Sequence, residues 1–170
     1  AGMFLNVNGG AANFITRLND DGSRDNTFNT GSGPNDIVKT VTLQSDGKIV
    51  AAGSSDPDGN FATNDSDFFL ARYNSNGSLD TSFDTDGKLT TTISVFGDYI
   101  LAVALQSDGK IVVAGGTSVE QTQNFVGTRH IALARYNSNG SLDSSFGTAG
   151  IVTTEISSLY SSAHSMAIQS

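Results

Sequence analysis

One eleven-residue block occurs twice in this chain without a single change, and this repetition constrains the fold more than any other feature. The block LARYNSNGSLD occupies residues 70–80 and again residues 133–143. A second block, LQSDGKIV, occupies residues 43–50 and 105–112, so both blocks recur at nearly the same spacing. A diverged copy of the first block occupies residues 15–25. Such internal self-similarity predicts a tandem array of one supersecondary unit.

The spacing of the repeat sets the size and the boundaries of the unit. Gln44, Gln106 and Gln169 occupy the same position of the second block and are 62 and 63 residues apart. The 170-residue chain therefore holds about 2.7 units. The expected units are a partial, diverged one over residues 1–40, a second over 41–102, a third over 103–165, and the start of a fourth over 166–170.

Each unit is predicted to form four short antiparallel strands. In the second unit these cover residues 41–44, 49–52, 67–73 and 88–93. An Asp-Gly pair separates the first two strands and an Asn-Gly pair follows the third, and both dipeptides favour tight turns with positive φ angles. Val41 and Leu43 alternate with polar residues along the first strand, so their side chains are expected on one face.

A period near 60 residues with four antiparallel strands is typical of one blade of a β-propeller. A single sheet cannot bury both of its faces, and packing several sheets face to face around an axis solves this problem. A stacked β-solenoid is the rival architecture, but its coils are usually shorter and its strands parallel. Because a propeller needs roughly four to eight blades, we expect the chain to be part of a larger ring. It would be a window of a longer protein, or several copies would assemble.

The repeated motifs resemble a known family. SDGKIVVAG at residues 107–115 and LARYNSNGSLDSSFG at residues 133–147 look like the delta-60 repeat, a bacterial repeat also catalogued as a β-propeller domain of unknown function. The resemblance implies a propeller in secreted or surface-exposed bacterial proteins, and it brings no enzymatic activity. The first copy departs from the pattern, with TRLN at residues 16–19 instead of ARYN and GSGP at residues 31–34 where the fourth strand should begin.

Composition excludes several classes of function. The net charge of −8 and the lack of any Lys/Arg cluster argue against a nucleic-acid partner. Without cysteine the chain has no disulfide and no thiolate metal site. No apolar run approaches the roughly 20 residues that a membrane helix needs, so membrane insertion is not expected.

Three Arg–Asp pairs recur at the same separation, one in each unit. One interpretation is a repeated anion or ligand site, and the other is a structural pair that fixes the register of each turn. Recurrence in every copy favours the structural interpretation, because catalytic sites are rarely triplicated. The pairs are Arg17 with Asp25, Arg72 with Asp80, and Arg135 with Asp143.

Two Asp-rich turns are weak candidates for calcium. Asp56 and Asp58, like Asp84 and Asp86, place carboxylates two residues apart before a glycine, as some calcium loops do. Neither turn has the twelve-residue ligand pattern with its closing glutamate. Turns in which the Asp side chain binds its own backbone explain both segments without metal, so we expect no cofactor and keep calcium as a testable alternative.

Positions that differ between the copies are the candidates for binding. The segments 54–66 and 116–129 link the second and third strands of their units and are unlike each other, which is typical of loops that carry binding surfaces. The candidate ligand residues in them are Phe61, Asn64, Phe125 and Arg129. A second variable position holds Lys39, Leu101 and His164 near the start of the presumed innermost strand, where they are predicted to edge the central channel.

These observations predict a non-enzymatic β-propeller scaffold or interaction module, extracellular or on the surface of a bacterial cell. Adhesion to a glycan or a protein is its concrete form, and other β-repeats of the same protein or a homo-oligomer are the expected partners. One alternative is a subunit of a self-assembling extracellular fibre. Another is a propeller enzyme, a lyase or hydrolase, with its site at the channel edge. No catalytic residue is predicted.

Overall fold

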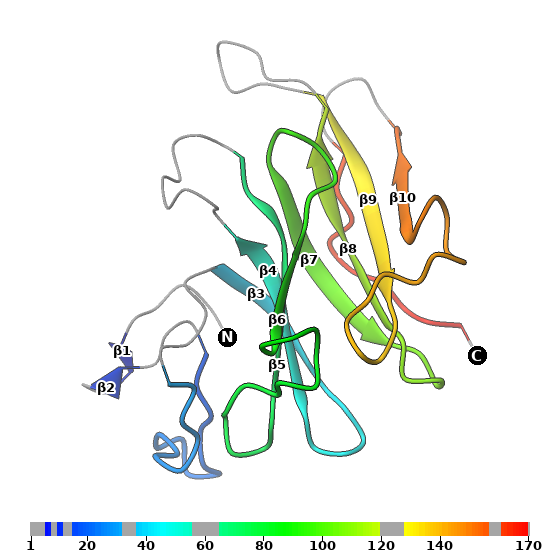
Figure 1. The fold of residues 1–170 in the computed structure, drawn as a ribbon. Helices are drawn as coiled ribbons and strands as arrows, with labels where there is room; N and C mark the ends of the chain where they lie inside the picture. The colour runs from blue at the N-terminus through cyan, green and yellow to red at the C-terminus, as the bar shows by residue number, and fades with distance from the viewer. Residues whose placement is uncertain are drawn as a thin grey trace.

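A computed structural model describes residues 6–7, 10–11, 15–31, 37–55, 65–119, 128–156 and 161–169. This part of the chain consists of ten β-strands joined by turns and loops, without a helix (Figure 1). It therefore contains no helical segment that is long and apolar enough to cross a membrane. The predicted all-β fold is confirmed.

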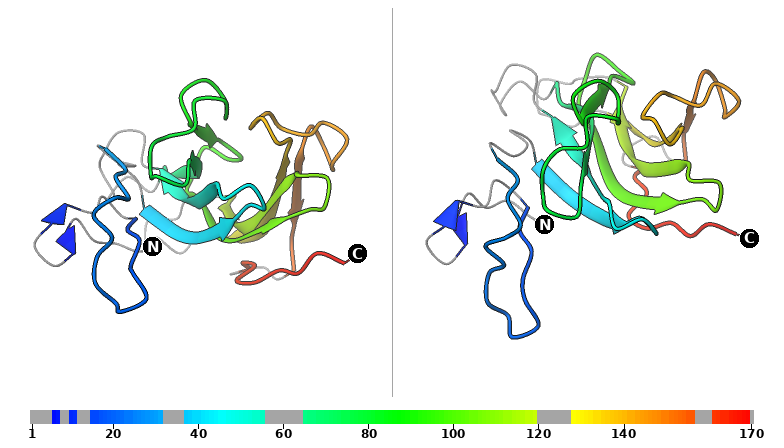
Figure 2. Two further views of the ribbon diagram at one scale, coloured as in Figure 1. Left: turned by 90° about the horizontal axis from the view of Figure 1, so that it is seen from below. Right: turned by 60° about the horizontal axis from the view of Figure 1, so that its bottom comes forward.

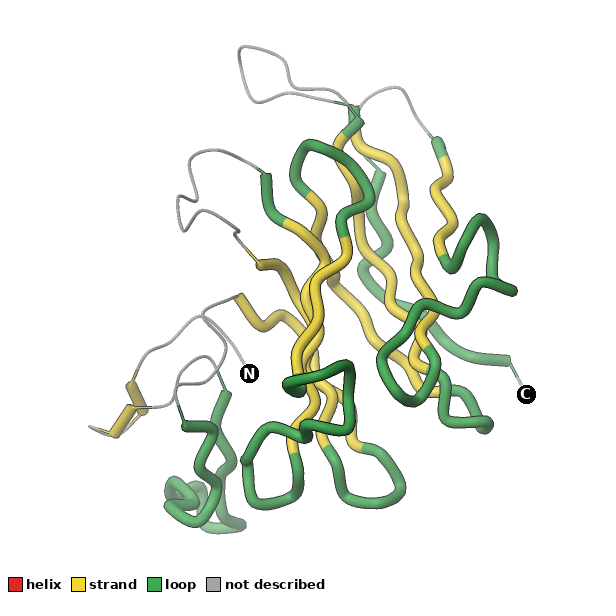
Figure 3. Tube along the Cα trace, in the orientation of Figure 1, coloured by secondary structure: helices red, strands yellow, loops and turns green. Residues whose placement is uncertain are grey.

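The second and third units each form one four-stranded antiparallel sheet. In each sheet the strands lie in chain order, so each strand pairs with its neighbours in the sequence. Figure 3 shows these strands in yellow and the described turns and loops in green. The first sheet contains β3 (Ile37–Leu43), β4 (Ile49–Ser55), β5 (Asp67–Tyr73) and β6 (Lys88–Thr91). The second contains β7 (Asp98–Leu105), β8 (Ile111–Ser118), β9 (Arg129–Tyr136) and β10 (Ile151–Thr154). In the first unit, β1 (Asn6–Val7) and β2 (Gly10–Ala11) form a short ladder.

The predicted strands of the second unit all exist, and three of the four have shifted ends. The third strand matches the prediction at both ends. The first begins four residues earlier than residue 41, the second continues to Ser55, and the fourth stops at Thr91. Val41 and Leu43 are 44% and 67% exposed, so the alternation of this strand does not mark a buried face.

A β-bulge explains why the first strand of each full unit is longer than its alternation suggests. In β3, Val38 pairs with Gly53 and Thr40 pairs with Ala52. Lys39 is therefore the extra residue. The bulge in β7 leaves Leu101 extra in the same way. A Cβ on Gly53 would lie 1.8 Å from the Ile37 carbonyl oxygen, so only glycine fits opposite the bulge.

The core lies between the units. One face of the β3–β6 sheet packs against the β7–β10 sheet, and its other face packs against the first unit (Figure 2). Because both faces are covered, every residue of β5 is buried. The layer between the two sheets contains Val50, Ala52, Phe68, Leu70 and Phe83 from one side, and Ile100, Ile111, Val113, Ala132, Ala134 and Tyr136 from the other. The layer toward the first unit contains Ile15, Phe28, Val38, Ala51, Phe69, Ala71 and Tyr73.

Candidate functional site

Each predicted Arg–Asp pair is in direct contact. In the second unit, Arg72 Nε donates to Asp80 Oδ2 at 2.7 Å, and Arg72 Nη2 donates to Ser82 Oγ at 3.1 Å. The guanidinium lies 4.7 Å from the centroid of the Phe83 ring, a cation–π contact. The same set recurs as Arg17 with Asp25, Thr27 and Phe28, and as Arg135 with Asp143, Ser145 and Phe146.

The aspartates of these pairs are held in their ionised form. Side-chain and backbone hydrogen bonds from Thr27, followed by the bond from Arg17, lower the pKa of Asp25 to about 2. For Asp80, burial acts to raise the pKa, and the bonds from its serine and arginine neighbours outweigh it, so the pKa is lowered. The pKa of Asp143 is lowered by equivalent bonds. Each carboxylate therefore stays charged opposite its arginine.

The arginines also connect consecutive units. Arg72 Nη1 donates to the carbonyl oxygen of Ser138 in the Asn-Gly turn of the next unit, at 2.5 Å. The backbone N–H of Asp84 donates to the next residue of that turn, Asn139, at 2.7 Å. The preceding junction has the same two bonds, from Arg17 Nη1 to Ser75 O at 2.6 Å and from Asn29 N to Asn76 O at 3.0 Å. The pair therefore fixes the turn of its own unit and the position of the next one.

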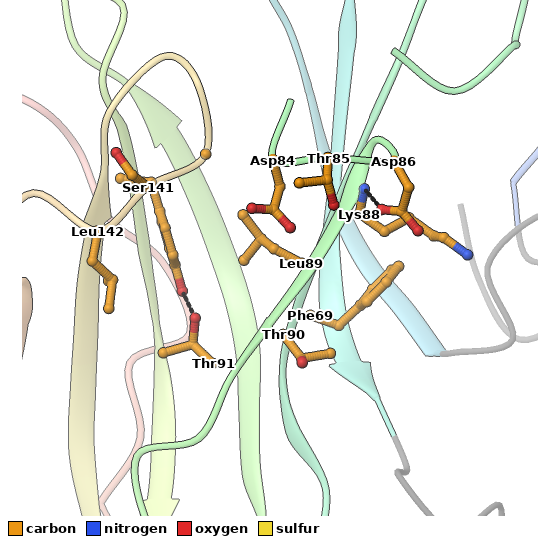
Figure 4. A pocket seen from close by; sticks show the side chains of 12 residues that line it. Phe69, Asp84, Thr85, Asp86, Lys88, Leu89, Thr90, Thr91, Ser141 and Leu142 are labelled. Atoms are coloured by element: carbon orange, nitrogen blue, oxygen red, sulfur yellow. Dashed lines mark hydrogen bonds between the residues drawn. The ribbon is translucent and has the colours of Figure 1, made fainter. Parts of the chain in front are cut away.

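A groove of about 590 Å³ runs between the two sheets beside this junction. One wall is the turn and strand that follow Asp84, and the other is the Asn-Gly turn of the third unit, including Ser141 (Figure 4). At its floor, Tyr136 OH donates to Thr91 Oγ1 at 2.8 Å, which joins the two walls. The lining residues are Phe69, Asp84, Thr85, Asp86, Lys88, Leu89, Thr90, Thr91, Tyr136, Gly140, Ser141 and Leu142.

The charged side chains of this groove do not belong to the repeat. Asp84, Asp86 and Lys88 lie on one wall, and both carboxylates are exposed. The equivalent residues of the third unit are Gly147, Ala149 and Ile151, and those of the first unit are Asn29, Gly31 and Gly33. Only the second unit therefore presents two carboxylates and an ammonium at this position.

The predicted loop residues divide between described and undescribed parts of the chain. Phe61, Asn64 and Phe125, and the calcium candidates Asp56 and Asp58, lie outside the described residues. Arg129 lies at the start of β9, and its guanidinium is 5.4 Å from the centroid of the Tyr99 ring.

The predicted channel-edge residues occupy matching places. Lys39 and Leu101 are the extra residues of the two bulges, and bulges commonly re-aim a side chain. His164 lies in the 161–169 segment, where its Nε2 is 3.0 Å from Ser162 Oγ. Ala163 N in this segment donates to Gly115 O on β8 at 3.0 Å. Their place at the edge of a channel stays a prediction.

The sequence did not predict the groove, although Asp84 and Asp86, which line one of its walls, are calcium candidates from the sequence. Asp84 and Asp86 lie on one wall of the groove, and the opposite wall is a turn of the next unit, of which a single repeat contains no sign. Among the described residues, no three His, Asp or Glu side chains lie together in an arrangement suited to a metal ion. The signal that could have found the groove is the failure of Asp84, Asp86 and Lys88 to recur.

Consecutive four-stranded antiparallel sheets, one per repeat unit and packed face to face, define the chain as a β-propeller segment. The family described as "Domain of unknown function (DUF5122) beta-propeller" matches residues 1–28, 44–83 and 106–146. The match covers more than half of the chain, so the chain belongs to this family. Among curated proteins, none matches the chain.

Proposed function

We propose that this chain is a non-enzymatic, extracellular interaction module that binds a hydroxyl-rich ligand, a glycan, in the groove between its second and third units. The observation that carries the proposal is the set of non-recurring charged side chains, Asp84, Asp86 and Lys88, on a frame that otherwise repeats. Repeat proteins commonly keep the frame constant and vary the binding position. The resemblance of the motifs to the delta-60 repeat supports the extracellular location.

The chemistry of the groove suits a sugar better than an anion. Two carboxylates can accept hydrogen bonds from neighbouring hydroxyl groups, and Lys88 and the hydroxyl of Thr90 can donate. Leu89 and Leu142 add half-buried apolar surface. The volume of about 590 Å³ falls within the range of roughly 300–1,000 Å³ typical of small-ligand sites.

A non-enzymatic role is supported by the positions of the aspartates whose pKa values are shifted. Burial raises the pKa of Asp98, and hydrogen bonds from the backbone N–H groups of Ile93 and Ser94 oppose this shift. Asp98 thus closes the loop between β6 and β7. The acids of the Arg–Asp pairs have lowered pKa values and structural partners. None of these groups lines the groove.

The test is a glycan array followed by calorimetric titration of the strongest hit. Asp86→Asn removes a charge from the groove, while the amide oxygen can still accept the bond that Lys88 N donates to Asp86 Oδ1 at 3.0 Å. Asp108→Asn is the matched control, because Asp108 accepts the equivalent bond from Lys110 N in a turn outside the groove. We expect Asp86→Asn to weaken binding at least about fivefold and the control to bind normally. A silent array, or equal binding by both variants, contradicts the proposal.

A further inference from the structure

The groove contains one of the three Asp-Gly-Lys turns of the chain, and the other two serve as an internal comparison. The sequence Asp-Gly-Lys occupies residues 46–48, 86–88 and 108–110. In each turn the lysine backbone N–H donates to Oδ1 of the aspartate, at 3.0 or 3.1 Å. In the two turns outside the groove, the lysine Nζ also donates to Oδ2 of the same aspartate, at 2.8 Å in one and 2.5 Å in the other. These two turns therefore neutralise their own charge.

The turn at the groove lacks the second of these bonds. In the part of the chain that the structure describes, Lys88 makes no ion pair, and the only bond to the Asp86 side chain comes from Lys88 N. Within the same residues, the Asp84 side chain has no hydrogen bond or ion pair. Figure 4 shows the Lys88 ammonium well apart from the Asp84 carboxylate. Both carboxylates are exposed, so the groove presents two negative charges without a cation bound to either.

The opposite wall of the groove brings no charge of its own. The residues that line it from the third unit are Tyr136, Gly140, Ser141 and Leu142, none of which is charged. Two carboxylates and one ammonium therefore leave the groove with a net charge of −1. This charge repels an anionic ligand, and a neutral ligand leaves both carboxylates to water. A ligand that carries its own cation can pair with them.

We propose that the preferred ligand of the groove is an amino sugar with a free, protonated amine. This inference rests on the proposed glycan binding and narrows it to one chemical class. The ammonium would donate to the unpaired oxygens of Asp84 and Asp86, and such charge-assisted bonds are roughly twice as strong as neutral ones. The ring hydroxyls would meet the hydroxyl groups of Thr90 and Ser141, which line the two walls. N-acetylation removes the charge of the amine, so the acetylated sugar loses these bonds.

Calorimetric titration with two matched tetramers of glucosamine tests this preference. One tetramer carries free amines and the other is fully N-acetylated, and the titration is made at about pH 6, where an amine of this kind carries its proton. We expect the wild type to bind the free-amine tetramer at least about tenfold more tightly, with a smaller preference at high salt. Spermine, which has as many amines and no sugar, should bind at least about tenfold more weakly than the free-amine tetramer.

Single substitutions test whether the preference arises in the groove. Asp84→Asn and Asp86→Asn each remove one charge, and asparagine tolerates the positive φ of residue 84. Each should weaken binding of the free-amine tetramer at least about fivefold and change binding of the acetylated tetramer less. Lys88→Gln removes a repelling ammonium and should strengthen binding of the free-amine tetramer. Asp108→Asn, in a turn outside the groove, is the matched control and should leave both affinities unchanged. Circular dichroism spectra that match the wild type show that each variant is folded.

The wild-type affinities for the two tetramers separate this inference from the proposed function. Equal or tighter binding of the acetylated tetramer overturns the amino-sugar preference and leaves glycan binding standing. A preference that survives both aspartate substitutions, or that Asp108→Asn reduces equally, also overturns it. Spermine bound as tightly as the free-amine tetramer would mean that charge alone attracts the ligand, which contradicts an amino-sugar site. If neither tetramer binds, the inference fails, and a silent glycan array then contradicts the proposed function as well.

Discussion

Substitution of Asp80 tests whether the Arg–Asp pairs hold the units together. Asp80→Ala removes the 2.7 Å bond from Arg72 Nε and the two bonds that Ser82 donates to Asp80 Oδ1. The Arg72 side chain is 7% exposed, so its charge would stay buried without its carboxylate. Breaking one partner of such a pair costs about 3–5 kcal/mol. The remaining bond from Arg72 to Ser138 places the expected loss near the lower end, about 3 kcal/mol.

This loss corresponds to a fall in Tm of about 10 °C for a chain of this length, measured by circular dichroism, with urea unfolding as a second measurement. Asp143→Ala is the internal control. It removes equivalent bonds, but the Arg135 side chain is 21% exposed and can be hydrated once its carboxylate is gone. We expect a clearly smaller fall in Tm for this variant. Equal falls for the two variants would refute the argument from burial, and a negligible fall for Asp80→Ala would refute the structural interpretation itself.

Three further measurements follow from the same contacts. Gly115→Ala should destabilise the chain by about 2 kcal/mol or more, since the added Cβ would lie 1.9 Å from the Tyr99 carbonyl oxygen and the bulge must shift; urea unfolding checks this. Stability should fall as pH drops from about 4 toward the lowered pKa of Asp25, about 2, because protonation breaks the Arg–Asp pairs. The raised pKa values of Asp67 and Asp98 act in the opposite direction, since protonation of these two is favoured in the folded state. Lowered pKa values are more numerous, at Asp21, Asp25, Asp46, Asp80, Asp108 and Asp143, so unfolding measured at several acidic pH values should show a net loss of stability. EGTA should leave Tm unchanged, and a clear fall in Tm would revive the calcium hypothesis.

Features that depend on one unit were predictable from the sequence. The Asp-Gly and Asn-Gly turns could be predicted because glycine favours the left-handed backbone conformation that these turns require, and Gly47 and Gly77 adopt it. The bulge at Lys39 was missed, since a bulge shifts the alternation by one residue and mimics a shorter strand. Its only signal was the glycine opposite it.

Contacts between two units could not be predicted from the sequence. The recurrence of Arg72 and Asp80 predicted the pair, but nothing in one unit shows that Arg72 also reaches Ser138. The groove was missed for the same physical reason, because its second wall belongs to the next unit. Repetition of the sequence identifies contacts within one unit, whereas contacts between neighbouring units are seen only in the three-dimensional structure.

The turn after the Arg–Asp pair separates folding from binding. Asp84 has a φ of +54°, and the equivalent residue of the third unit, Gly147, has +53°, so two different side chains occupy one backbone conformation. Most side chains are strained there, and glycine is not. Asp84→Gly should therefore leave the free energy of unfolding within about 1 kcal/mol of the wild type, since relieved strain offsets the greater chain entropy of glycine. It should also weaken glycan binding, because a carboxylate leaves the groove. A variant that unfolds more easily yet binds normally would show that Asp84 serves the fold, and the groove would lose its main support as a binding site.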